Sequence, residues 1–117
     1  MNIFYSEARG WSNVPNDTPI QESASQVLEI FRALDLKRGF LGIVLDANRV
    51  LQLMPEKGGK VQVELLDCSK PALDSSSVDR AFAEQLIKLT GEGKDPFVFA
   101  RENISNWNHT DLPREEQ

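Results

Sequence analysis

Two side chains could supply a nucleophile and a base: Cys68 is the only cysteine and His109 the only histidine. A cysteine attacks as its thiolate, so such an enzyme needs a base close enough to activate the thiol. The residues around Cys68 carry no signature of a cysteine enzyme, and both side chains fall in segments expected to be loop or tail. We therefore expect Cys68 to have no catalytic role. We also expect no enzymatic activity, because no set of nucleophile, base and oxyanion donors can be assembled.

Metal chemistry is no better supported by the residues. A zinc site needs three or four nitrogen, sulfur or oxygen ligands at close spacing, and one cysteine with one histidine cannot supply the usual sets. Carboxylates such as Glu64 with Asp67, or Asp79 with Glu92, could hold the metal of a nuclease. However, Asp79 falls in a predicted helix and Glu92 in a predicted loop, which does not favour a fixed ligand geometry. We expect neither a metal ion nor a cofactor.

Two short stretches combine glycine with lysine, as phosphate-binding loops do: residues 91–94 and residues 58–60. Neither has the spacing of a P-loop or the Ser/Thr that follows its lysine, and the first stretch follows a predicted helix where a P-loop precedes one. We interpret residues 91–94 as a helix end with a turn, and residues 58–60 as a hairpin turn.

The charge of the chain limits its partners. The 117 residues include 18 acidic and 13 basic side chains, which give a net charge of −5. Nucleic acids and anionic membrane surfaces both require a basic field, so neither is an expected partner. An acidic surface does attract a basic protein, because complementary fields raise the rate of association. A protein partner is therefore the expectation that the charge supports.

The compartment is indicated by two further features. A single cysteine excludes an internal disulfide, which fits a reducing environment. The first residues lack the basic start and the long apolar run of a secretory signal, and no stretch approaches the ~20 apolar residues that span a bilayer. These features predict a cytoplasmic protein.

Hydrophobic periodicity predicts the elements that would position these side chains. Apolar residues at helical spacing predict helices over residues 18–37 and 76–90. Apolar or alternating runs between two turns predict an antiparallel meander of strands at residues 40–45, 49–54 and 60–66. Further strands are expected at residues 2–6 and 97–100. The order predicts one α+β domain over residues 1–117, with two amphipathic helices packed on an antiparallel sheet of the meander and the late strand.

Within this domain Phe31, Val44 and Phe82 are expected to be nearly inaccessible, because each lies at the centre of an apolar face or run. Residues 103–117 are expected to be a polar, loosely ordered tail. Trp11 and Trp107 lie in the least regular segments and could either close the ends of a small core or anchor an interface.

The order of elements from residue 27 to residue 99 resembles that of small bacterial immunity proteins, which neutralise toxins of contact-dependent and secreted competition systems. The resemblance is carried by Leu51-Gln52 in the second meander strand, the alternating residues 61–65, and a glycine-rich turn and aromatic segment after the late helix. It implies a cytosolic, non-catalytic protein that binds one cognate toxin. Many toxins of these systems are nucleases with basic clefts.

Class I chaperones of type III secretion are a second resemblance, since they are small, acidic and built from a helix, three strands and a helix. That resemblance implies an obligate dimer that binds an unfolded effector segment, whereas an immunity protein can be monomeric, so the oligomeric state is open. The contacts that would attract a basic partner are the carboxylates at strand ends or in loops: Asp46, Glu56, Glu64, Asp67 and Asp74.

Overall fold

The computed structural model describes residues 1–6, 18–34 and 39–112. Trp11, residues 35–37 of the first predicted helix and residues 113–117 of the predicted tail lie outside these ranges. Within them the elements follow in this order: β1 (Asn2–Ser6), β2 (Ile20–Gln21), α1 (Ala24–Arg32), β3 (Phe40–Val44), β4 (Arg49–Pro55), the 3₁₀ helix η1 (Lys57–Gly59), β5 (Lys60–Asp67), β6 (Ala72–Asp79), α2 (Arg80–Gly91), α3 (Pro96–Asn103) and β7 (Asn108–Asp111).

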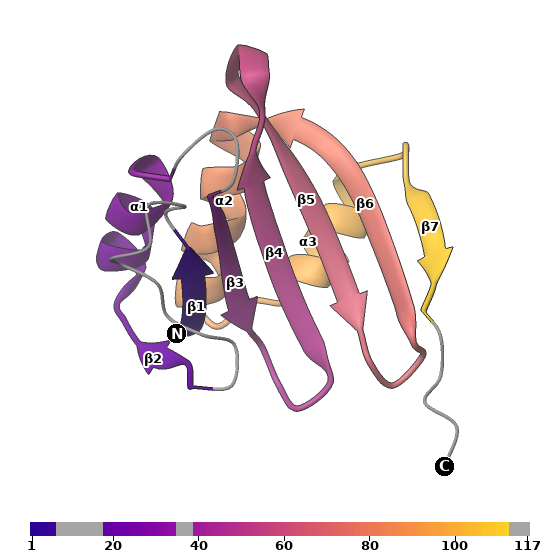
Figure 1. Cartoon of the computed structure of the whole chain (residues 1–117), viewed down its shortest axis with the longest axis horizontal. Coiled ribbons are helices and arrows are strands. Elements are labelled where there is room, and N and C mark those ends of the chain that lie inside the picture. Colours follow the sequence, from indigo (N-terminus) through magenta and orange to yellow (C-terminus); the bar gives the residue numbers. More distant parts are fainter. Residues whose placement is uncertain (7–17, 35–38, 113–117) are drawn as a thin grey trace.

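The described strands form one antiparallel sheet in the order β2-β1-β3-β4-β5-β6-β7. Each of β3 to β6 pairs with the strand next to it in sequence, while β1 and β7 are added at the two sides (Figure 1). The register places Leu51 of β4 opposite Ile43 of β3 and opposite Leu65 of β5. Because all three side chains point to the same face, this register builds a continuous apolar layer. The α+β fold class and the meander of β3, β4 and β5 are confirmed.

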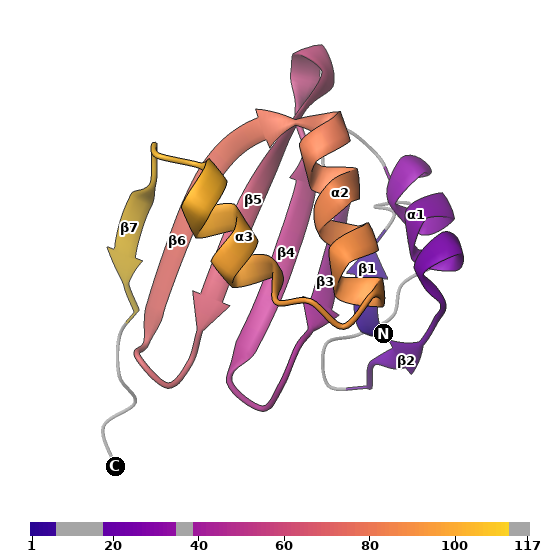
Figure 2. The ribbon, with the colours of Figure 1, turned by 180° about the vertical axis from the view of Figure 1, so that it is seen from behind.

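The helices lie on one face of this sheet. Figure 2 shows α2 and α3 lying over the sheet, with α1 beside α2 at the side of β1. The opposite face of β4, β5 and β6 is covered by none of the described helices (Figure 1). Successive residues of a strand point to opposite faces, and β4 and β5 accordingly alternate between side chains in the core and side chains on the uncovered face.

Helix α1 begins at a capping box. The Ser23 side chain accepts a hydrogen bond from the backbone N–H of Gln26, and the Gln26 side chain accepts one from the backbone N–H of Ser23. These bonds satisfy backbone donors that the first turn would otherwise leave unpaired. The predicted start at residue 18 is therefore wrong, because Ile20 and Gln21 instead pair with β1 as β2.

The core lies between the sheet and the helices. Its fully inaccessible side chains include Phe31 of α1, Leu86 of α2 and Leu53 of β4. The prediction for Phe31 is confirmed, but those for Val44 and Phe82 are wrong, because both are only partly buried. Val44 alternates with the buried Ile43 and so points to the uncovered face, while Phe82 lies at the edge of the core and stacks on Phe99.

Two segments differ in type from the prediction. Residues 72–79 form β6, so the predicted helix over residues 76–90 starts only at Arg80. Residues 97–100 were predicted to be a strand and belong to α3, where the Asp95 side chain accepts a hydrogen bond from the Phe97 backbone N–H and Pro96 occupies the first turn. Proline suits that position because its missing N–H would be unpaired there anyway.

The segment predicted as a tail also contains regular structure. Asn103 ends α3, and Asn108–Asp111 is β7, which pairs with β6 from Ser75↔Asn108 to Ala72↔Asp111. Between them, Trp107 packs against the core and donates its indole N–H to the carbonyl of Ile104.

Candidate functional site

The side of the sheet formed by β4, β5 and β6 that faces away from the helices is left uncovered by the described helices (Figure 1). We define the open face as three rows of residues that the register places side by side on this surface. The rows run across the strands and are an apolar row (Val44, Val50, Leu66 and Leu73), a polar row (Gln52, Glu64 and Ser75) and an end row (Met54, Gln62 and Ser77). All are partly accessible except Ser77, which is exposed.

Glu64 occupies the centre of the open face. It lies in the middle of β5, opposite Gln52 on one side and Ser75 on the other. Partial burial raises the pKa of Glu64, and the hydrogen bond that it accepts from Nε2 of Gln62 at 3.3 Å opposes that rise. Among the described residues, no Lys, Arg or His forms an ion pair with it.

Asp74 lies on the other side of the sheet, in β6. It accepts hydrogen bonds from Nη1 of Arg101 in α3 at 2.7 Å and from Nδ1 of His109 in β7. Burial alone would raise the pKa of Asp74, but the Arg101 and His109 bonds outweigh burial and hold it below its usual value. The same bond from His109 to Asp74, with a second to Asp111, raises the pKa of His109. Asp74 therefore links β6 to α3 and to β7.

The remaining three predicted carboxylates lie at the ends of strands. Asp46 follows β3 and forms an ion pair with Nε of Arg49 at 2.8 Å, while the same arginine bridges to Asp95 before α3. Asp67 ends β5 and accepts a hydrogen bond from the hydroxyl of Ser69 in the following turn.

Glu56 lies at the opposite end of the sheet from Asp46 and Asp67. It follows β4 directly and accepts a hydrogen bond from the Ser77 hydroxyl at 2.8 Å. The structure thus brings Asp46 and Asp67 together at one end of the sheet, where both line a depression of 330 Å³. It leaves Asp74 on the helix side of the sheet, Glu64 at the centre of the open face and Glu56 bonded to Ser77 at the end of that face, so the five carboxylates do not form one surface.

Cys68 and His109 do not contact each other in the described part of the chain. Cys68 is exposed in the turn between β5 and β6. Both ring nitrogens of His109 are engaged by the carboxylates of Asp74 and Asp111. Within residues 1–6, 18–34 and 39–112, no group of three or more His, Cys, Asp or Glu side chains is placed to hold a metal ion.

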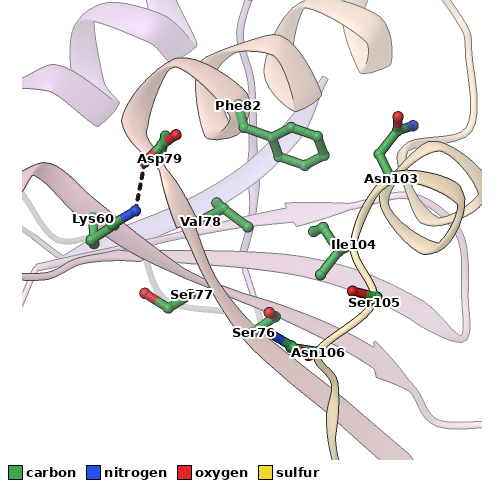
Figure 3. Close-up of a pocket in the computed structure, with 10 residues that line it drawn as sticks. All are labelled: Lys60, Ser76, Ser77, Val78, Asp79, Phe82, Asn103, Ile104, Ser105 and Asn106. Carbon is green, nitrogen blue, oxygen red and sulfur yellow. Dashed lines mark hydrogen bonds and ion pairs between the residues drawn. The ribbon is translucent and has the colours of Figure 1, made fainter.

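A second hollow lies between the end of β6, the start of α2 and the end of α3 (Figure 3). It has a volume of 270 Å³ and an apolar wall of Val78, Phe82 and Ile104. Lys60 and Asp79, joined by an ion pair of 2.7 Å, lie at one side of it. This hollow is open and shallow, and it suits a single side chain of a partner better than an enclosed small molecule. Sequence reasoning missed it because residues 103–106 reach β6 only through the packing of α3.

Comparisons with known proteins found no match: no family model matches the sequence, no curated protein matches it, and no solved structure matches the fold. None of the helices in the described ranges is long and apolar enough to cross a membrane.

Proposed function

We propose that this protein is an immunity protein, which binds a cognate bacterial toxin domain in the cytoplasm and neutralises it without chemistry of its own. The observation that carries the proposal is the open face. A sheet buries at least one of its faces against other elements, and α1, α2 and α3 cover only one face here. The open face instead presents an apolar row beside a polar row, which is the surface composition that protein interfaces combine.

The shape of the surface supports a protein as the ligand. The open face is built from four neighbouring strands and is not enclosed, whereas small molecules are bound in concave sites that cover most of their surface. Partly exposed apolar side chains that adjoin one another across strands mark interaction surfaces more often than isolated ones do. The inhibitor would thus act by covering a surface of the toxin.

The charge of the chain supports a basic partner. The net charge of −5 complements the basic clefts expected in toxins that act on nucleic acids. A non-catalytic role is favoured by the state of the two most reactive side chains. Both nitrogens of His109 are engaged by carboxylates, and Cys68 is not among their partners.

The proposal is tested by co-expression with the product of the gene next to this one, which the proposal expects to contain a toxin domain. Cells that carry the domain alone should stop growing, whereas cells that also carry this chain should grow, and the two proteins should co-purify. Growth arrest that persists despite normal levels of the folded chain would contradict the proposal. A stable dimer that fails to protect but retains an unfolded segment of a secreted effector would instead support the chaperone.

A further inference from the structure

We propose that the open face is the surface that holds the toxin, and that Glu64 at its centre accepts a basic side chain of the toxin domain. This inference rests on the proposed function and names the contact on which binding depends. The partner surface that would fit the open face carries an arginine or lysine surrounded by apolar side chains.

The carboxylates of the chain differ in what already neutralises them. Asp74 is paired with Arg101 and His109, and Asp46 is paired with Arg49. Asp67 is held within its own turn by Ser69. Glu64 forms no ion pair with any described residue, although it lies within the sheet, away from the strand ends. A carboxylate in that position retains free acceptor sites for a guanidinium or ammonium group.

The environment of Glu64 makes such a contact selective. Partial burial already disfavours its charged form, and a cation docked on it would restore that form. Glu56 also lacks an ion pair among the described residues, but it lies beyond the end of β4 and is bound by Ser77. Among the carboxylates of the described residues, Glu64 therefore alone combines a central position on a broad surface with a charge that no ion pair neutralises.

The apolar row supplies the second half of the contact. Val50 and Leu66 are paired across β4 and β5, and Leu66 and Leu73 are paired across β5 and β6, directly beside the polar row. A partner packed on this row would exclude water from the ion pair at Glu64. Exclusion of water by a surrounding ring of contacts is what makes a central charged contact important for affinity. A rim carboxylate, in contrast, acts mainly on the association rate.

The test compares two variants that each remove one carboxylate. Glu64→Gln keeps the size of the side chain and removes its charge. Glu102→Gln makes the same change on the exposed surface of α3, where it leaves the net charge of the chain identical to that of Glu64→Gln. The probe is the toxin domain identified by the co-expression test, purified with its catalytic residue replaced, and the dissociation constant is measured by calorimetry at two salt concentrations.

We expect Glu64→Gln to weaken binding at least about tenfold and Glu102→Gln to change it less than about twofold, because truncation of a desolvated charged contact outweighs loss of a distant surface charge. Leu66→Ser should weaken binding as Glu64→Gln does. If wild type and Glu64→Gln bind equally well, the docking surface is wrong and the proposed function stands. If the wild-type chain itself neither binds nor protects, the proposed function falls and the inference falls with it. Urea unfolding of each variant excludes misfolding as the cause of lost binding.

Discussion

Arg101 of α3 donates a hydrogen bond to Asp74 of β6 across 2.7 Å, and the other carboxylate oxygen of Asp74 is bound by His109 of β7. The side chain of Asp74 is 12% exposed, whereas those of Arg101 and His109 are 47% and 56% exposed. One largely buried carboxylate thus binds two more accessible side chains, the guanidinium of Arg101 and the imidazole of His109. Through them it fixes a helix and an edge strand that the core contacts alone would hold less firmly.

Asp74→Asn should destabilise the protein, because it removes the negative charge that accepts the hydrogen bonds of Arg101 and His109. The free energy of unfolding should fall by about 1–3 kcal/mol, the range of hydrogen bonds to charged groups. Urea unfolding at neutral pH measures the change. Asp111→Asn is the control, since the Asp111 side chain is 87% exposed and should matter little. Equal effects of the two substitutions would contradict the role given to Asp74.

The free energy of unfolding should fall both at acid pH, where Asp74 is protonated, and at alkaline pH, where His109 loses its proton. The folded-state pKa of His109 is raised, so its contribution is complete below the ordinary value of about 6.5 and is lost as pH rises through the folded pKa. The folded-state pKa of Asp74 is lowered, so its contribution is complete above about 3.9 and is lost as pH falls through the folded pKa.

Titration of the single histidine by NMR measures the first of these values directly. We expect a midpoint above that of an unstructured histidine, and a return toward the ordinary value in Asp74→Asn. His109→Gln should abolish the loss of stability on the alkaline side and leave on the acid side only the part that the Arg101 bond to Asp74 supplies. A His109 that titrates at its ordinary value in the folded chain would overturn this assignment.

Phe31→Ala should be among the most destabilising substitutions, because the Phe31 side chain is fully buried between α1, the sheet and α2, where Arg80 lies over its ring. We expect a loss of about 3–5 kcal/mol in the free energy of unfolding, the usual range for a phenylalanine removed from a core. Phe82→Ala is the matched comparison. It should cost less, because Phe82 is only partly buried and its ring stacks on Phe99 at the edge of the core. A larger loss of stability for Phe82→Ala than for Phe31→Ala, in thermal or urea unfolding, would show that Phe31 is not at the centre of the core.

Gly42→Ala should destabilise the sheet through a clash with Phe4. The ring of Phe4 lies on Gly42 of the neighbouring strand, and a Cβ at residue 42 would overlap that ring. Overpacking of this kind costs roughly 1–3 kcal/mol. Phe4→Ala in the same chain should relieve the clash, so the double variant should lose less stability than the sum of the two single variants. Additive losses in urea unfolding would mean that Gly42 is required for another reason.

The meander could be predicted because alternation and turn residues agree there. Residues 61–65 alternate in burial as their sequence alternates in polarity, and with the turn residues between the apolar runs this located β4 and β5 to within one residue. The same alternation predicted that the Glu64 side chain lies on the more solvent-exposed face of the sheet. Val44 could not be assigned a side in this way, because β3 is apolar at every position and only its neighbours decide which residues meet the helices.

The errors have local physical causes. Phe97, Val98 and Phe99 have the composition of a strand, but the cap at Asp95 and the proline after it start a helix. Ser75, Ser76 and Ser77 are typical of helix caps or loops, yet pairing with β5 makes them a strand. The neutralisation of Asp74 could not be predicted at all, because its partners lie 27 and 35 residues further along the chain and reach it only through the topology.

The position of Asp74 has a consequence for the nascent chain. Until residues 108–111 have been synthesised, β6 is the edge of the sheet and its outer backbone groups have no strand to pair with. A charge that points toward the core side of an edge strand discourages pairing with the same edge of another molecule, because the charge would be buried without a counter-ion. Asp74 is thus suited to oppose aggregation through the β6 edge during synthesis. Once α3 and β7 have formed, the same carboxylate binds Arg101 and His109 and so links β6 to both elements.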